Sequence, residues 1–308
     1  MRVLIIARYK ERGFAPFVTE QVAALEKTGV ECRCFPVRSK GITGYLKQLP
    51  ELRRVIKEFK PDVVNAHYGL CGLLANLQRR KPVVTTYHGS DINEKPVLRL
   101  SKIAIRLSAY NVFVSQKIID IAKPKNNYAL IPCGINLDDY PIVEKAEARV
   151  QMGLQLDKKY VLFAGAYDNT VKNAPLAKAT VALLNDENVQ LLELKGYTRP
   201  QVALLMQAAD ALLMTSVTEG SPQVIKEALA CGCPIVSVDV GDVKERVKDV
   251  EGCFMAERDA DKLALALKKA LSYGRRTNGR DAITRDGLTN DAIALKLKNI
   301  YSVVTANR

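Results

Sequence analysis

Short apolar runs alternate with amphipathic segments along the chain, in two successive series. A buried strand of a parallel sheet is a short apolar run, whereas a covering helix shows apolar residues every three or four positions. The first series predicts strands at 2–7, 30–37, 62–66, 82–86, 110–115 and 127–132, with helices at 16–28, 50–59, 69–80, 96–108 and 116–123. The second predicts strands at 160–165, 189–194, 210–214, 234–238 and 252–255, with helices at 173–185, 199–208, 222–231, 242–249 and 259–272. A last helix, at 288–305, has no strand after it.

This alternation predicts an α/β protein with two Rossmann-like domains in tandem. We expect the first domain at 1–140 and the second at 141–287, with the last helix, in 288–308, as a candidate to return and complete the first. In open α/β sheets the ligand lies beyond the carboxyl ends of the strands. Two such domains facing each other are therefore expected to bind their ligand in a cleft.

Composition agrees with a globular protein of two domains. The chain has 308 residues, of which 48% are apolar, and no apolar run approaches the about 20 residues of a membrane span. Residues 2–7 are too short for the core of a signal peptide. The seven cysteines include no C-x-x-C pair, which favours reduced thiols in the cytoplasm. With only two histidines besides, a zinc site is not expected.

The segment with the most candidate site residues is Thr218–Val236, TEGSPQVIKEALACGCPIV. It places Glu219 and Glu227 around a predicted junction between a loop and a helix. We expect Ser221 to be the N-cap and Pro222 the first helical residue. The N–H groups of Gln223 and Val224 would then form an anion site at the positive end of the helix dipole. Two carboxylates beside a phosphate site suit a sugar nucleotide, although each glutamate alone would be an ordinary solvated residue.

The whole segment resembles the E-x7-E signature of the retaining glycosyltransferases of family 4, which have the GT-B fold. This resemblance implies transfer of a hexose from a nucleotide-diphosphate sugar to a hydroxyl acceptor, without a metal or a further cofactor. It implies that Glu219 and the Gly220–Ser221 backbone hold the sugar hydroxyls and that Glu227 holds the ribose. The acceptor would be a glycan or a lipid-linked sugar in the synthesis of a cell-surface polysaccharide or glycolipid.

Both histidines follow predicted strands, and His88 opens a second matching motif. His88-Gly89-Ser90-Asp91 resembles the HG-x-D segment of the family, which implies that His88 lies in the catalytic site. Without this resemblance, a histidine at the end of a strand is more often a structural residue. Asp91 either contacts the acceptor or caps the next helix, and the sequence leaves both roles open.

The loop Phe163–Asn173 resembles the family's diphosphate loop, which carries an arginine and a lysine. Lys172 matches the lysine, but Ala166 stands where the arginine is expected. Asn169, Asn173 or an arginine of the first domain is then needed to replace one phosphate contact. In the later turn ELKGYTR, the resemblance implies contacts to the nucleobase, and Tyr197 either stacks on the base or closes the turn.

Two further segments resemble the family more weakly. Gly13 is the one glycine left in a turn that is usually glycine-rich, and Arg8, Lys10 and Arg12 offer charge in place of backbone contacts to the diphosphate or acceptor. IPCGINLDDY, at 131–140, resembles the connection between the domains, where Gly134 is expected to adopt a special backbone angle.

Asp259-Ala260-Asp261 has the form of a D-x-D metal motif. It lies at the start of an amphipathic helix, where Asp259 suits the N-cap and Asp261 the helix dipole. We therefore interpret it as helix capping and expect no metal site.

Charge is uneven along the chain, and it suggests alternatives. Residues 1–150 hold 25 Lys and Arg against 14 Asp and Glu, a net charge of +11 out of +13. The basic side chains are not interleaved with aromatics, so nucleic-acid binding is not expected. An epimerase or hydrolase on the same fold would need an additional acid–base pair. The cations Arg53, Arg54, Lys57 and Lys60 form either a solvated face or an attachment to an anionic membrane, which would make the protein peripheral on the inner face of the cell membrane.

Overall fold

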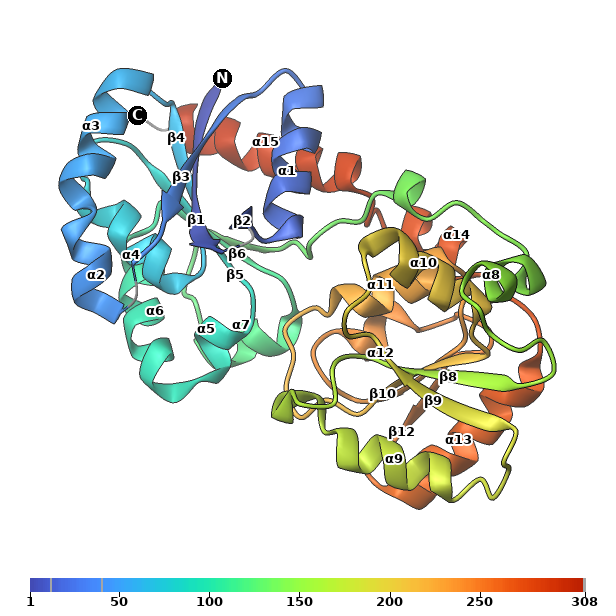
Figure 1. The fold of residues 1–308 in the computed structure, drawn as a ribbon. Coiled ribbons are helices and arrows are strands. Elements are labelled where there is room, and N and C mark those ends of the chain that lie inside the picture. The colour runs from blue at the N-terminus through green and yellow to red at the C-terminus, as the bar shows by residue number, and fades with distance from the viewer. Residues whose placement is uncertain (12, 40, 307–308) are drawn as a thin grey trace. The chain divides into compact units, whose positions relative to one another are not determined.

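The computed structural model describes residues 1–11, 13–39 and 41–306, which fold into two compact units (Figure 1). Unit 1 is Met1–Gly134 with Leu288–Arg308, and unit 2 is Ile135–Gly287. Each unit has one mainly parallel sheet with helices against it, so the predicted α/β class with two parallel sheets is confirmed.

Unit 1 has a sheet in the order β3-β1-β4-β5-β6-β7, all parallel, with the short β2 pairing antiparallel to β1. Its strands are β1 Arg2–Lys10, β2 Gly13–Phe14, β3 Glu31–Val37, β4 Val63–His67, β5 Val83–Tyr87, β6 Tyr110–Phe113 and β7 Tyr128–Leu130. Its helices are α1 Pro16–Lys27, α2 Gly41–Lys47, α3 Leu49–Phe59, α4 Gly69–Leu77, α5 Ser90–Asn93, α6 Lys95–Leu107, α7 Gln116–Ala122 and α15 Asn290–Ala306.

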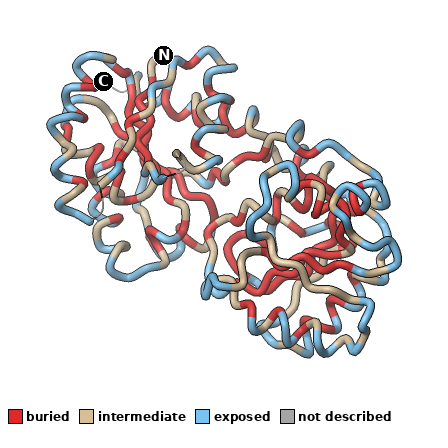
Figure 2. The backbone as a smooth tube through the Cα atoms, in the orientation of Figure 1, coloured by how far each residue is buried: buried red, intermediate tan, exposed pale blue. Residues whose placement is uncertain are grey.

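Strand β1 is apolar without alternation because both of its faces are covered. Val3 and Ile5 pack toward a cluster that includes residues of α1 and α15, whereas Leu4 and Ile6 pack toward α3 and α4. Figure 2 shows this buried centre in red. The last helix therefore does return to unit 1, where Tyr301 is fully buried.

Unit 2 has a five-stranded parallel sheet in the order β12-β11-β10-β8-β9. Its strands are β8 Lys159–Phe163, β9 Val189–Glu193, β10 Ala211–Met214, β11 Ile235–Val238 and β12 Phe254–Ala256. Its helices are α8 Lys145–Gln151, α9 Ala174–Ala182, α10 Arg199–Ala208, α11 Gln223–Ala230, α12 Val243–Arg246, α13 Ala260–Tyr273 and α14 Gly279–Arg285, and two 3-10 turns are η1 Leu137–Asp139 and η2 Thr170–Lys172.

The helices α8 and α14 were not expected, because neither carries an apolar stripe. The buried residues of α8 are Ala148 and Arg149, and the Arg149 guanidinium donates hydrogen bonds to Asp210 Oδ2 at 2.8 Å and to the Ala208 carbonyl at 3.0 Å. A buried arginine with these partners takes the place of an apolar anchor, and a search for apolar periodicity does not detect it.

The connection between the units differs from expectation in two respects. The division falls after Gly134, and Arg280 of unit 2 donates hydrogen bonds to the carbonyls of Tyr140 at 2.8 Å and Leu137 at 3.1 Å. The expectation of a special backbone angle at Gly134 is wrong, since its φ is not positive. Space requires this glycine instead, because a Cβ there would lie 2.5 Å from Asn290 Oδ1.

Within residues 1–11, 13–39 and 41–306, no helix has both the length and the apolar character needed to cross a bilayer. The seven cysteines are all free thiols.

Candidate functional site

The strand order of unit 2 reverses at β8, which lies between β9 and β10. At such a switch point the loops leaving neighbouring strands diverge, and open α/β sheets bind ligands in the crevice between them. The loop after β8 leads to Lys172, and the loop after β10 carries Glu219. Two residues predicted from separate motifs thus follow the two strands that meet at this point.

Lys172 and Glu219 form an ion pair with 2.6 Å between Nζ and Oε1, and their side chains are 20% and 17% exposed. The two loops are also joined through their backbones. The Val217 N–H donates to the Val171 carbonyl at 2.8 Å, and the Thr215 hydroxyl donates to the Lys172 carbonyl at 2.8 Å. A Cβ on Gly165 would lie 2.6 Å from Lys172 Cγ, so this glycine leaves room for the lysine.

Helix α11 begins one residue later than expected, and the predicted capping is wrong. Pro222 is the N-cap, with an extended ψ of 123°, and the first helical residue is Gln223. The Ser221 hydroxyl instead donates a hydrogen bond to Asp242 Oδ2 at 2.8 Å. Gln223 and Val224 still occupy the first turn, where N–H groups have no acceptor within the helix. Glu227 lies on the same helix and accepts a hydrogen bond from the buried Tyr140 hydroxyl at 3.1 Å.

A buried charged network supports this loop, and sequence reasoning missed it. Asp242 and Lys226 are 4% and 0% exposed, and Lys226 Nζ donates to Gln223 Oε1 at 2.6 Å. Burial raises the pKa of Asp242, while Lys226, Arg246 and the Ser221 hydroxyl act in the opposite direction. The position of Asp242 just beyond strand β11 was the available signal.

Gly241 packs directly against the loop that carries Glu219 and Gly220. Its φ is +56°, and a Cβ there would lie 2.6 Å from the Gly220 carbonyl oxygen and 3.2 Å from Glu219 Cβ. The backbone of Gly220 and the start of the Glu219 side chain therefore rest directly on Gly241. The strained angle and the lack of space both require glycine.

The loop Phe163–Asn173 has Ala166 at the position of the expected arginine and contains no arginine elsewhere. The side-chain oxygen of Asn169 accepts a hydrogen bond from the Val171 N–H at 3.1 Å, which stabilises the turn. Asn173 has a left-handed φ of 55°, and its side chain makes no capping hydrogen bond. Tyr197 is 41% exposed in the next turn, which leaves its ring open for stacking.

In unit 1 the strand order reverses at β1, between β3 and β4. The carboxyl ends of β4 and β5 bring the two histidines together, with 3.0 Å between His67 Nδ1 and His88 Nε2. The rings of Phe17 and Tyr68 each lie 4.6 Å from the His88 ring, between centroids. On its other side, His88 Nδ1 lies 3.6 Å from Cys133 Sγ. The His88 ring is therefore in contact with four side chains.

Asp91 caps a helix other than the next one along the chain, whereas its contact with the acceptor stays a prediction. Its buried carboxylate accepts hydrogen bonds of 3.0 Å from the backbone N–H groups of His88, Gly89 and Gly69. Gly69 is the first residue of α4, so Asp91 caps that helix and fixes the turn of His88 at the same time. Burial raises the pKa of Asp91 to about 6, against the lowering effect of the three donors.

Beside these residues unit 1 contains a cavity of about 520 Å³. Arg8, Lys10 and Gly13 line one side, and Tyr68, Asp91 and Glu94 contribute to the remainder. Gly13 has a φ of +104° in the β1–β2 hairpin, an angle that favours glycine. Arg12, the third cation expected at this turn, lies outside the described residues. Tyr68 has a φ of 72°, which is rare for a bulky residue and marks strain at this wall.

Burial lowers the pKa of His67 to about 4. Since the folded pKa is below the unfolded value near 6.5, this residue contributes stability above pH 6.5 that is lost as the pH falls toward 4. We expect wild type to lose about 2 kcal/mol more unfolding free energy between pH 7 and pH 5 than His67→Asn. Urea unfolding at both pH values measures this difference. Asp91 titrates in the opposite direction but is present in both proteins, and equal losses would contradict a buried neutral His67.

The predicted residues thus form two groups, each within one unit. Lys172, Glu219, Gly220, Ser221 and Glu227 gather with Asn173 and the first turn of α11 in unit 2. His88 and Gly13 belong to unit 1. In the part of the chain that the structure describes, no three His, Cys, Asp or Glu side chains are arranged to hold a metal ion. Asp259 accepts a hydrogen bond from the Lys262 N–H at 3.0 Å, so its interpretation as a helix cap is confirmed.

Two units, each with a parallel sheet and polar groups at its switch point, are what the GT-B type requires, and comparison with known proteins agrees. The family model Glycosyltransferase Family 4 matches residues 5–139, and the model Glycosyl transferases group 1 matches residues 143–273. The chain belongs to this family of glycosyltransferases.

A curated relative is the putative teichuronic acid biosynthesis glycosyltransferase TuaC of Bacillus subtilis, which is 26% identical over 75% of this chain and 69% of its own length. The chain spans about three fifths of the length of the next curated relatives. Among solved structures, sucrose-phosphate synthase from Thermosynechococcus elongatus has a TM-score of 0.83 at 18% identity, over the whole of both chains. Anabaena HepE in complex with UDP has a TM-score of 0.77 at 16% identity, over 98% of this chain and all of that one. These likenesses concern the fold, and they confirm GT-B.

Proposed function

We propose that this protein transfers a hexose, with retention of configuration, from a nucleotide-diphosphate sugar to a hydroxyl acceptor in the synthesis of a cell-surface polysaccharide. The observation that carries this proposal is the Lys172–Glu219 ion pair at the switch point of unit 2, next to the first turn of α11. Family membership, the teichuronic acid relative and the UDP-bound structure of Anabaena HepE support the same chemistry.

In the proposed mechanism, Lys172 and the first-turn N–H groups of α11 stabilise the diphosphate as it leaves. Preorganised charges of this kind usually supply the largest part of enzymatic rate enhancement. Glu219 and the Gly220–Ser221 backbone form hydrogen bonds with the sugar hydroxyls and orient them. We assign the diphosphate oxygen as the acceptor of the proton from the attacking hydroxyl, because retention then needs no carboxylate nucleophile.

We assign the acceptor to the cavity of unit 1. Its lining groups include Arg8, Lys10 and Glu94, which together can bind the hydroxyl and anionic groups of a sugar. His88 lies on the same unit, and its ring is fixed by His67 and Tyr68. We propose that it orients the transferred hexose.

A thermal-shift screen of UDP, GDP, ADP and their sugars tests the proposal directly. A ligand at 100 times its dissociation constant stabilises a protein by about 2.7 kcal/mol, which is readily measured. The nucleotide sugar that corresponds to the bound nucleotide is then incubated with the protein and candidate acceptors, and the products are separated. Absence of binding by every nucleotide would contradict the proposal, and an epimerised donor without a transfer product would favour the epimerase alternative.

Glu227→Gln is expected to weaken binding of that nucleoside diphosphate about tenfold, because a carboxylate bonds the ribose hydroxyls more strongly than an amide does. Tyr140→Phe should give a smaller loss, since it removes only the hydroxyl that orients Glu227. Calorimetric titration measures both changes. The control is Glu147→Gln on α8, where the carboxylate accepts an exposed hydrogen bond from Gln151. Unchanged affinity in Glu227→Gln would remove Glu227 from the site.

A further inference from the structure

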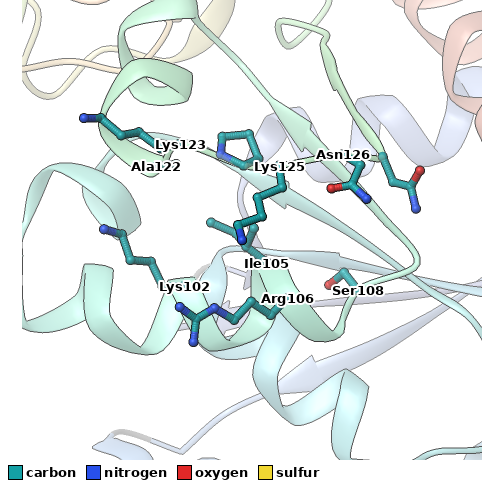
Figure 3. Close-up of a pocket in the computed structure, with 10 residues that line it drawn as sticks. Lys102, Ile105, Arg106, Ser108, Ala122, Lys123, Lys125 and Asn126 are labelled. Atoms are coloured by element: carbon teal, nitrogen blue, oxygen red, sulfur yellow. The ribbon is translucent and has the colours of Figure 1, made fainter.

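A second hollow in unit 1 has an unusual lining. It has a volume of about 330 Å³ and lies between the ends of α6 and α7 (Figure 3). Lys102 and Arg106 come from α6, while Lys123 and Lys125 follow from the end of α7. The other lining residues are apolar or neutral, so no carboxylate belongs to this hollow. We call this set of four cations the α6–α7 basic site.

The four cations have no ion-pair partner among the residues that the structure describes. The surrounding chain explains this. From Lys95 to Leu130 there are seven Lys and Arg but a single carboxylate, Asp120, which accepts a hydrogen bond from Gln116 at 2.8 Å. A concentration of positive charge without counter-ions on the protein attracts an anionic surface.

The face expected from the sequence to bind membranes is different in character. On α3, Arg54 pairs with Glu51 and with Glu58. Arg53 donates a hydrogen bond to the Leu77 carbonyl at 3.1 Å. On α3, one of the four cations is therefore ion-paired and a second is hydrogen-bonded within the protein, in contrast to the α6–α7 basic site.

Large apolar side chains are exposed on the same two helices. Ile103 and Leu107 of α6 are 43% and 52% exposed, and Ile121 of α7 is 41% exposed. A free anion in solution needs no such apolar groups. An interfacial helix, in contrast, combines lysines and arginines with apolar side chains that enter the boundary between headgroups and acyl chains.

We propose that the α6–α7 basic site binds the phosphate of an anionic phospholipid headgroup, with Ile103, Leu107 and Ile121 entering the interface. Unit 1 would then be held reversibly at a membrane surface without a spanning segment. The proposal is independent of the chemistry assigned to unit 2.

The test is co-sedimentation of the full chain with vesicles of phosphatidylcholine, with and without about 30% phosphatidylglycerol, at low and high salt. Wild type should bind the anionic vesicles at low salt and be released by salt. At low salt, replacement of Lys102, Arg106, Lys123 and Lys125 by Gln should lower partitioning at least tenfold. The double variant Ile103→Ser with Leu107→Ser should also lower it at low salt, although the four cations are retained.

The matched control replaces Arg53, Arg54, Lys57 and Lys60 by Gln, which removes the same charge from α3. Retained binding in the control and lost binding in the first variant support the proposal, whereas the reverse result overturns it. Wild type that stays in the supernatant at low salt also overturns it, even if inorganic phosphate raises the melting temperature. Nucleotide binding and the melting temperature show whether each variant is folded. If the fourfold Gln variant does not fold, the single variants Lys102→Glu and Arg106→Glu are tested in its place.

Discussion

Glu219→Gln is expected to lower the turnover number for hexose transfer by about tenfold to 150-fold, the factor for loss of one hydrogen bond to a charged group. The glutamine keeps the shape of the side chain but binds sugar hydroxyls more weakly. Nucleoside diphosphate binding should persist, because Lys172 then has no carboxylate partner and is available to the diphosphate. Initial rates together with calorimetric titration of the nucleotide measure the two effects separately.

The control for this variant is Glu251→Gln, which changes an exposed pair with Arg275 in the same unit. It should retain the wild-type turnover number. Near-native turnover in both Glu219→Gln and Glu227→Gln would contradict the assignment of the paired carboxylates.

Lys172→Ala is expected to lower transfer at least tenfold, about 1.4 kcal/mol of transition-state stabilisation. It removes the ammonium that is proposed to meet the leaving diphosphate, and EDTA should leave the wild-type rate unchanged. Rates at saturating donor, with and without EDTA, measure both effects. Lys159→Ala is the control, since Lys159 pairs with Asp186 3.9 Å away at the start of β8. An absolute requirement for a divalent cation would show that the diphosphate is neutralised by other means.

The strands and main helices could be predicted from the sequence because both sheets are buried on two faces. Continuous apolar runs such as Leu4–Ile6 or Ala211–Met214 have few alternative structures. Resemblance in two separate motifs also pointed to Lys172 and Glu219, and the structure shows that these two side chains form an ion pair. Short polar helices such as α14 lack such a pattern, and they were missed.

Contacts that depend on tertiary packing could not be predicted. Serine is a common N-cap residue, but the Ser221 hydroxyl forms a stronger, charge-assisted hydrogen bond with the buried Asp242 carboxylate. Here a partner about twenty residues away in the chain outweighed the local preference. Lys226 occupies a helical position that would suit a solvated residue, and only the fold shows that it is fully buried.

The Lys172–Glu219 contact also bears on how the affinity for the donor differs from the affinity for the nucleotide product. In the proposed mechanism a bound donor separates the two side chains. A complete nucleotide sugar then gives each a new partner, the diphosphate for Lys172 and the hexose hydroxyls for Glu219. After transfer, the nucleoside diphosphate can satisfy Lys172 alone and leaves a mostly shielded carboxylate without a ligand. Re-formation of the ion pair then competes with the spent nucleotide, so that product release is favoured by the same contact that the donor had to open.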